Sequence, residues 1–271
     1  MDEEILHGGV ASAGAVVRLG DHVLRPSNQH TPTIHRFLTY VRAAGFNGAS
    51  EPIGVDADGR ERLHFIAGDV PTPPYPDWAQ YDDAIISATE LLRGLHDASA
   101  GFDTSEATWS SELADSTPIA SDDVVICHND ICLENVVFTD GRATGLLDFD
   151  FAAPGRRSFD VAAFARMCVP IDDPTNSARN GWGDIDRVRR LRVIVDAYGL
   201  DAARRAEVIE CLDTTIGSGG EFVRHRVEAG DANFIAMWNA MGGAERFDRR
   251  RAWWAEQRNA FAAILAESKP T

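Results

Sequence analysis

Apolar residues are spaced differently in the two parts of this chain. Before residue 69, short apolar runs such as 16–17 and 61–68 alternate with polar and glycine-containing turns, which is typical of strands. In residues 78–98, apolar side chains recur three and four positions apart, which predicts a helix with one buried face. Helical spacing is also found in residues 188–198, 203–216, 220–228, 231–241 and 249–266. The pattern therefore predicts an α+β fold with a β-rich beginning and a mainly helical end.

Two apolar runs in the middle of the chain predict a hairpin. Residues 136–138 and 144–147 read as strands, and Asp140-Gly141 between them is a dipeptide typical of tight hairpin turns. Asn135 lies directly before the first strand and Asp148 directly after the second. We therefore expect the hairpin to bring these two side chains together.

Asp130 completes this group of polar side chains. It lies two residues after His128 and five before Asn135. Phosphoryl transfer needs a group that accepts the proton of the attacking hydroxyl, and oxygen ligands for the Mg²⁺ on the phosphates. Mg²⁺ keeps several waters, so one carboxylate and one amide can suffice. We interpret Asp130 as the catalytic residue of a phosphotransferase, and Asn135 and Asp148 as its metal ligands.

The motif His-x-Asp-x-x-x-x-Asn, followed by Leu-Asp-Phe, resembles the aminoglycoside phosphotransferase family of small-molecule kinases. Four residues match it position by position: His128, Asp130, Asn135 and Asp148. The resemblance implies a protein-kinase-like fold with two lobes. Residues 1–68 would form a small nucleotide-binding lobe, and residues 69–271 a larger lobe with the catalytic loop, the metal site and a helical acceptor region.

The same resemblance implies supporting roles for three further side chains. His128 is expected to be structural, and Asp160 to brace the catalytic loop or to cap the next helix. Asp150, two residues past Asp148, is expected either to approach a second metal or the acceptor, or to be a solvated acid at the end of the hairpin.

Residues before position 69 offer candidates for nucleotide contacts. The glycine-rich segment 8–15 is interpreted either as a turn over the phosphates, with Gly9 and Gly14 allowing close approach, or as a plain flexible hairpin. By resemblance, the strand over 61–68 leads to the contact with the base of the nucleotide, where Phe65 and Ile66 are the candidates.

The chain has a single lysine, Lys269, near its end. Kinase-like folds usually place a lysine on the third strand, where it pairs with the phosphates and with a glutamate on the next helix. Here Arg25 is interpreted either as the residue that takes the place of the lysine or as a surface arginine at the end of a strand. The expected helix over 33–44, which Gly45 would end, contains no acid, and His35 lies near the glutamate position. We therefore expect the usual ion pair to be absent.

Composition narrows the classes of partner and compartment. The formal net charge of −16 disfavours nucleic acid, and it suits either a generally acidic surface or attraction of a cationic small molecule. No apolar run long enough to cross a membrane and no secretory signal pattern occurs, and the four cysteines lack a zinc or disulfide spacing. A cytoplasmic location is expected.

The sequence thus favours transfer of the γ-phosphate of ATP or GTP to the hydroxyl of a small molecule, possibly a cationic aminoglycoside-like compound. A kinase for a metabolite such as choline, homoserine or a sugar amine is one alternative. A kinase-like binding protein with little or no turnover is the other. The tryptophans at 238, 253 and 254 are expected in the core, and acids beyond residue 170 are candidates for the acceptor site.

Overall fold

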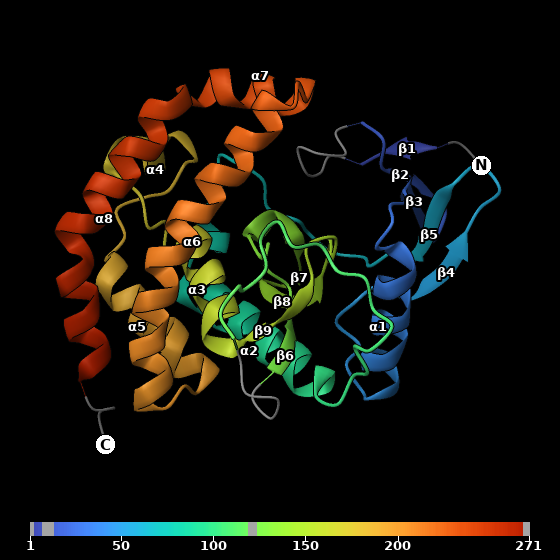
Figure 1. The fold of residues 1–271 in the computed structure, drawn as a ribbon, viewed down its shortest axis with the longest axis horizontal. Helices are drawn as coiled ribbons and strands as arrows, with labels where there is room; N and C mark the ends of the chain where they lie inside the picture. Colours follow the sequence, from blue (N-terminus) through green and yellow to red (C-terminus); the bar gives the residue numbers. More distant parts are fainter. Residues whose placement is uncertain (1–2, 7–13, 119–123, 268–271) are drawn as a thin grey trace.

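The amino-terminal part is a five-stranded antiparallel sheet flanked by one helix (Figure 1). The computed structural model describes residues 3–6, 14–118 and 124–267. The strands lie in the order β1-β2-β3-β5-β4. Their bounds are Glu4–Ile5 for β1, Val17–Leu19 for β2, His22–Pro26 for β3, Pro52–Val55 for β4 and Arg60–His64 for β5, with helix α1 over Thr31–Ala43. Gly45 follows α1 with a φ of 95°, so the expected end of this helix is confirmed.

The remainder of the chain is mainly helical. Its helices are α2 (Asp82–Ser99), α3 (Arg157–Cys168), α4 (Pro174–Arg179), α5 (Arg187–Tyr198), α6 (Ala202–Glu228), α7 (Ala232–Met241) and α8 (Gly243–Ala266). The apolar face of α2 is buried through Ile85, Leu92 and Leu95, as its spacing predicts. In Figure 1, α6 and α8 run side by side on the far side of the molecule from the sheet. The predicted α+β class, β-rich first and helical afterwards, is confirmed.

Helix α6 corrects one expectation. Residues 203–216 and 220–228 were expected as two helices, but they form one continuous helix that runs through the glycines at 217, 219 and 220. A Cβ on Gly219 would lie 3.1 Å from the guanidinium of Arg166, and one on Gly220 would lie 3.0 Å from the ring of Phe247. The missing side chains thus let neighbouring groups pack against the helix, and this packing compensates for the low helix propensity of glycine.

Two short antiparallel pairs position the motif residues. Strands β7 (Val136–Thr139) and β8 (Arg142–Leu146) form the expected hairpin, with φ of 51° at Asp140 and 75° at Gly141. Strand β6 (Val124–Cys127) pairs with β9 (Ala153–Arg156). Because β9 contains a proline and a glycine, its sequence gives no strand signal.

The hairpin also joins the amino-terminal part to the rest of the chain. Leu146 N–H donates to the carbonyl of Gly48 at 2.7 Å, and Asp69 and Phe138 exchange two backbone hydrogen bonds of 2.8 Å. The lobe boundary near Gly68 stays a prediction. Within residues 3–6, 14–118 and 124–267, no helix combines the length and apolar character needed to cross a membrane.

Candidate active site

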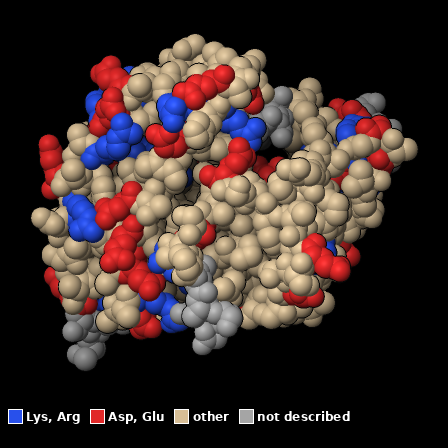
Figure 2. All heavy atoms as spheres, viewed as in Figure 1, with Lys and Arg blue, Asp and Glu red and all other residues tan. Residues whose placement is uncertain are grey.

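A cleft of about 1070 Å³ separates the motif residues from the last helices. One side is formed by Asp130, Asp148 and Asp150, and the other by residues of α6, α7 and α8. Residues 28–30 before α1 and residues 109–113 close it at the edge. Figure 2 shows the hollow between the helical part and the sheet, with charged side chains at its rim.

The loop that carries Asp130 is held by one buried carboxylate. Asp160, on α3, accepts hydrogen bonds from the backbone N–H groups of His128 at 2.6 Å and Asn129 at 2.9 Å. Asn129 has a φ of 65°, and its side chain donates to the carbonyl of Phe151 at 2.8 Å, which fixes this uncommon conformation. The contacts agree with the expectation that Asp160 braces the loop.

Asp160 has a third partner that the motif did not include. The Nε2–H of His96, on α2, donates to Asp160 at 2.9 Å, and His96 Nδ1 lies 2.6 Å from the hydroxyl of Tyr198 on α5. Burial acts to raise the pKa of Asp160, but the hydrogen bond and charge of His96 outweigh it and hold this pKa below its usual value. Three helices thus meet at one carboxylate, so the brace also ties α2, α3 and α5 together.

His128 links the loop to the end of β8. Its Nε2–H donates to the carbonyl of Leu147 at 2.8 Å, and its ring packs on Phe149 with centroids 4.7 Å apart. His128 is fully buried, and burial lowers its pKa. The ring is therefore neutral and packed, in accordance with the expected structural role.

Asp130 and Asn135 are in direct contact. The side-chain amide of Asn135 donates to the backbone carbonyl of Asp130 at 2.8 Å and lies 3.5 Å from its carboxylate. Because the NH₂ group is used in this way, the amide oxygen is left for another partner. Burial, followed by the nearby charge of Asp148, raises the pKa of Asp130 to about 7.

Asp148 lies next to this pair, as the hairpin predicted. The backbone N–H of Leu147 donates to the carbonyl of Asn135 at 2.9 Å, and Asp148 itself has a φ of 61°. A left-handed conformation at a non-glycine residue costs energy and is often found at functional sites. The carboxylates of Asp130 and Asp148 therefore line the cleft, and the amide of Asn135 is hydrogen-bonded to Asp130 beside them. Together the three groups form a donor set suited to Mg²⁺.

Arg25 contacts three carboxylates at once. Its guanidinium pairs with Glu61 at 2.9 Å, with Asp148 at 3.1 Å and with Asp150. These charges raise the pKa of Arg25 although burial acts to lower it. Asp150 therefore belongs to the site through Arg25. It is not the free solvated acid that one reading of the sequence allowed.

The usual ion pair with an acid of the next helix is absent, as expected, but an acid from the sheet takes its place. Helix α1 carries no acid, but Glu61 on β5 provides one. One carboxylate oxygen of Glu61 pairs with Arg25, and the other lies 2.8 Å from the Nε2 of His35. Strand β5 pairs with β3 so that Glu61 faces Arg25 directly. The arginine thus has a buried acidic partner from the sheet, which a search confined to the helix could not find.

The other candidates for nucleotide contacts are two glycines, Gly9 and Gly14, and the strand residues Phe65 and Ile66. Gly14 has a φ of 77° and open space where a side chain would be, whereas Gly9 lies outside the described residues. Phe65 is covered by the guanidinium of Arg18, 3.9 Å from its ring, and Ile66 packs against Gly145 of β8. Neither Phe65 nor Ile66 lines the cleft, so contact with the base stays a prediction.

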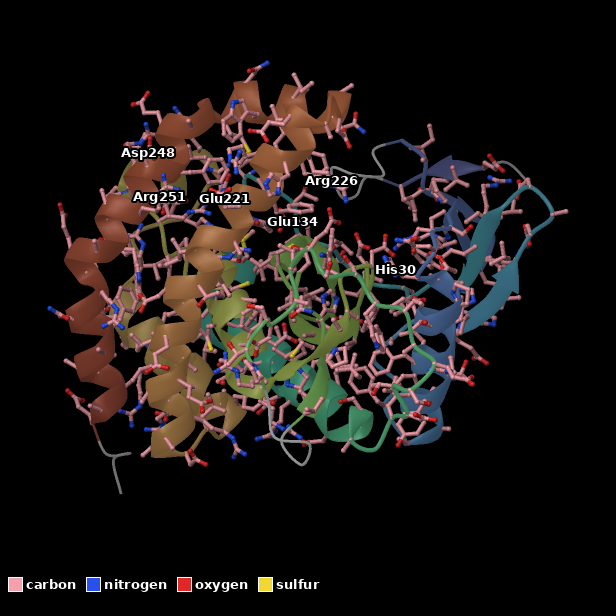
Figure 3. The ribbon with its side chains drawn as sticks, viewed as in Figure 1. His30, Glu134, Glu221, Arg226, Asp248 and Arg251 are labelled. Atoms are coloured by element: carbon pink, nitrogen blue, oxygen red, sulfur yellow. The ribbon has the colours of Figure 1, made fainter. Side chains whose placement is uncertain are left out.

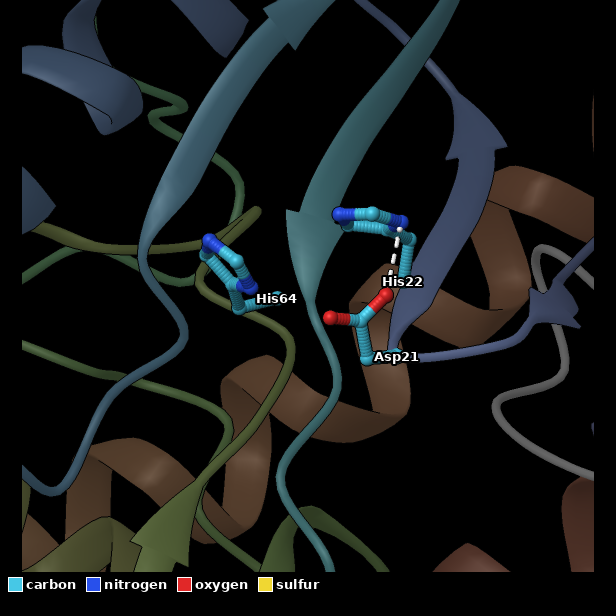
Figure 4. Close-up of side chains that lie close together, drawn as sticks. All are labelled: Asp21, His22 and His64. Carbon is cyan, nitrogen blue, oxygen red and sulfur yellow. Dashed lines mark ion pairs between the residues drawn. The ribbon is translucent and has the colours of Figure 1, made fainter.

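A separate cluster on the sheet brings together Asp21, His22 and His64 (Figure 4). The imidazole of His22 lies 3.1 Å from Asp21, and the two rings are 5.3 Å apart. These residues do not line the cleft, so they do not belong to the site formed by Asp130 and Asp148.

The far wall of the cleft combines aromatic and basic side chains. Trp238 stacks on Phe247 with centroids 5.4 Å apart, and both line the cleft, so Trp238 is not a core residue as expected. Trp254 is in the core, only 5% exposed. Figure 3 places Glu134, Arg226 and His30 around this space, from the central loop, from α6 and from the residue before α1. The spacing of residues could not predict that Trp238 lines the cleft while Trp254 is in the core, because both side chains recur at helical spacing.

The acids beyond residue 170 do not form this wall. Seven were candidates for the acceptor site: Asp172, Asp173, Glu221, Glu228, Asp231, Glu245 and Asp248. None of them lines the cleft. Glu221 and Asp248 instead pair with the exposed Arg224 and Arg251 on the helix surface. The cleft therefore offers acids near Asp130 and arginines along its helical wall.

The site has a braced loop that carries an acid and an amide, and a second acid follows a hairpin next to this loop. A cleft lies beside these groups. This combination defines a kinase-like phosphotransferase. The profile of the phosphotransferase enzyme family matches residues 89–208. The trifolitoxin immunity protein of Rhizobium leguminosarum bv. trifolii is 30% identical over 217 residues, which cover 79% of this chain and 80% of that protein. The chain belongs to the phosphotransferase enzyme family.

Solved structures of low sequence identity share the fold. A choline/ethanolamine kinase family protein from Mesorhizobium loti matches with a TM-score of 0.64 at 18% identity, over 98% of this chain and 92% of that one. The GDP complex of aminoglycoside 2'-phosphotransferase-IIIa matches with a TM-score of 0.57 at 13% identity, over 93% of each chain. The resemblance to small-molecule kinases with a protein-kinase-like fold is thus confirmed.

Proposed function

We propose that this protein transfers the γ-phosphoryl group of ATP or GTP to a hydroxyl of a small molecule bound in the cleft. The observation that carries the proposal is that Asp130 and Asp148 line one wall of that cleft, with Asn135 hydrogen-bonded to Asp130. Family membership supports the reaction class. A similar fold has been solved with bound GDP, which supports a nucleotide as the phosphoryl donor.

In this proposal, Asp130 orients the acceptor hydroxyl and takes its proton. The group lies at the cleft, and burial makes its carboxylate more basic than usual, as a general base requires. Asn135 is fixed by its hydrogen bond to the Asp130 carbonyl, so its amide oxygen is pre-positioned. The Asp130 loop is in turn fixed by Asp160, which limits the freedom of the catalytic carboxylate.

Asn135 and Asp148 would hold Mg²⁺, because their free oxygens are the hard ligands that this ion prefers. The ion would neutralise charge on the phosphates during transfer. Arg25 would contact the same phosphates in place of the usual lysine, as its planar guanidinium can bind two phosphate oxygens at once. Its pairing with Glu61 supports this role, because it holds the arginine at the edge of the site.

Calorimetry with ATP or GTP, with and without Mg²⁺, tests the metal assignment. Asp148→Asn is expected to weaken Mg²⁺-dependent nucleotide binding by about tenfold or more, since one of two protein ligands loses its charge. Asp140→Asn is the matched control, because Asp140 also has a positive φ but is at the exposed tip of the hairpin. Equal affinities of the parent and Asp148→Asn would remove Asp148 from the metal site.

Turnover tests the role of Asp130. We expect Asp130→Asn to lower kcat by roughly 10²- to 10⁴-fold, the usual contribution of a general base, while nucleotide affinity changes little. The assay is release of ADP or GDP across a panel of small alcohols and amino alcohols. An unchanged kcat would exclude Asp130 as the base.

A second function is favoured by one observation. Arg25 already pairs with both Asp148 and Asp150, so the charges expected to hold metal are neutralised by the protein itself. This arrangement suits a kinase-like protein that binds a ligand with little or no turnover. Release of nucleoside diphosphate that depends on an added acceptor would exclude it.

The biological setting proposed here is inactivation of a toxic compound. A relative is named as an immunity protein, and phosphorylation of a hydroxyl would change the charge and shape of such a compound. A metabolite kinase of the choline, homoserine or sugar-amine type is the alternative within the same reaction class. We place the reaction in the cytoplasm, where ATP and GTP are available; the four cysteines are free and buried.

A further inference from the structure

The helical wall of the cleft carries positive charge that lacks acidic partners. Arg166 on α3 and Arg246 and Arg250 on α8 all line the cleft. Arg250 pairs with the buried Asp172, with its Nε 2.8 Å from the carboxylate. In the part of the chain that the structure describes, neither Arg166 nor Arg246 makes an ion pair. Three guanidinium groups therefore face one carboxylate.

Arg166 is half-buried beside the cleft. Its guanidinium packs against α6 at Gly219, where a Cβ would lie 3.1 Å away and would force it to shift. Its Nε is buried without a hydrogen-bond partner among the described residues. Burial, with the charge of Arg250, lowers the pKa of Arg166 to about 10, so the group is still charged at neutral pH.

Arg246 is in a similar position on the neighbouring helix. It is 8% exposed, and its guanidinium donates to the sulfur of Met241 at 2.7 Å, a weak acceptor. Burial and the charge of Arg250 lower its pKa to about 10 as well. Each of the two arginines therefore feels the charge of Arg250, and neither forms an ion pair with an acid among the described residues.

An unpaired buried cation is costly, and a protein keeps one where a ligand supplies the opposite charge. We propose that Arg166 and Arg246 bind an anionic group of the acceptor, a carboxylate or a phosphate, at the helical wall of the cleft. This inference rests on the proposed function, in which the cleft holds the acceptor. It names the class of acceptor: a hydroxyl compound that is anionic rather than polycationic.

The rest of the wall indicates what the acceptor carries besides the anion. Phe222 on α6 and the stacked Trp238 and Phe247 line the cleft next to the arginines. Aromatic faces bind apolar or planar groups, and guanidinium groups among them favour bidentate pairing with carboxylate or phosphate. Among the cleft residues, α6, α7 and α8 contribute arginines and no acids, so the acids of the cleft lie away from this wall.

The charge of Arg166 reaches the catalytic carboxylate. It acts to lower the pKa of Asp130, against the larger effect of burial. Arg166 and Asp130 both line the cleft, so an acceptor bound there can present a hydroxyl to Asp130 and an anion to Arg166 together.

The first experiment compares thermal stability without multivalent anions. Arg166→Met and Arg246→Met are expected to raise the Tm by a few degrees, because each replaces a buried unpaired charge by an apolar side chain of similar length. Arg224→Met is the matched control, since Arg224 is exposed on α6 and pairs with Glu221 and Glu228. A Tm equal to or below that of the parent in both variants would assign the arginines a structural role and overturn the proposal.

The second experiment measures charge selectivity by calorimetry in the absence of nucleotide. N-acetylphenylalanyl derivatives of serine, homoserine and threonine serve as probes, each as the free acid and as the C-terminal amide. We expect the parent to bind at least one acid about tenfold more tightly than its amide, the effect of one charge-assisted pair. The Arg166→Met/Arg246→Met double variant should lose this preference, and Arg224→Met should keep it.

The outcomes separate this inference from the proposed function. The anion site is overturned if the parent binds no acid more tightly than the corresponding amide. It is also overturned if the double variant still prefers the acid. Both outcomes are independent of the result with nucleotide. Inorganic phosphate is titrated in parallel: binding that the double variant loses supports a phosphate-bearing acceptor over a carboxylate. Failure of Mg²⁺-nucleotide binding would overturn the proposed function while leaving the acid preference measurable.

Discussion

Replacing Asp160 with asparagine tests the brace of the catalytic loop. Asp160 is fully buried and accepts from three donors: the backbone N–H groups of His128 and Asn129 and the ring of His96. Asparagine has nearly the same shape, but one of its two terminal groups is an NH₂. That group would face an N–H donor, so at least one buried donor would lose its acceptor.

The expected loss of stability follows from these contacts. One buried donor without a partner costs about 1–3 kcal/mol, and removal of one charge from a buried pair costs about 3–5 kcal/mol. Because both effects act on the same group, we expect a total of roughly 3–5 kcal/mol and not their sum. This is a large share of the roughly 5–15 kcal/mol that stabilises a folded domain, so the variant should still fold but melt about 10 °C earlier.

Urea unfolding followed by circular dichroism measures the effect. Asp213→Asn is the control, because Asp213 also accepts from a ring N–H, that of Trp254, and pairs with Arg258, but its side chain is 40% exposed. Screening by solvent limits that change to about 1 kcal/mol or less. A free energy of unfolding for Asp160→Asn within about 1 kcal/mol of the parent would refute the reasoning. Turnover should fall with it, since the loop carries Asp130.

Three further predictions follow from the same contacts. Arg25→Met should weaken nucleotide binding by about tenfold or more. Arg25→Lys should recover only part of the affinity, because one ammonium cannot reproduce a planar contact with several carboxylates. Equal nucleotide affinities of the parent and Arg25→Met, measured by calorimetry, would contradict this prediction. Gly68→Ala should cost about 1–3 kcal/mol in urea unfolding, because its φ is 148° and a Cβ would lie 2.5 Å from the Phe138 carbonyl oxygen; Gly14→Ala, with open space at the Cβ, should cost less. The pKa of Asp160 is lower in the folded protein than in the unfolded chain. The charged form of Asp160 therefore stabilises the folded state fully above the unfolded-state pKa, and this stabilisation is lost as the pH falls through the folded-state pKa. Below about pH 4, the parent should thus lose more stability than Asp160→Asn.

Several features of the site could be predicted because they depend on neighbours along the chain. Asn135 and Asp148 meet because a two-residue turn at Asp140-Gly141 reverses the chain between them, and such a turn is specified by its own residues. Arg25 could be assigned by its place among apolar strand residues. The class of fold followed in the same way from the periods of the apolar residues.

Other features depend on segments that are far apart in the sequence. Glu61 reaches Arg25 only because β5 pairs with β3, and no local pattern marks that register. Helix α6 continues through its glycines because Arg166 and Phe247 pack there, and Trp238 faces the cleft because of how α7 meets α8.

The chain alone therefore determined the reaction class, and it predicted the catalytic loop and the metal ligands, since their geometry is local and their residue types are chemically restrictive. Only the tertiary structure decided what surrounds them: the acid that holds Arg25, the third partner of Asp160 and the arginines opposite Asp130. These depend on the packing of helices and strands, and burial turns an ordinary surface residue type such as arginine into a charge that needs a partner.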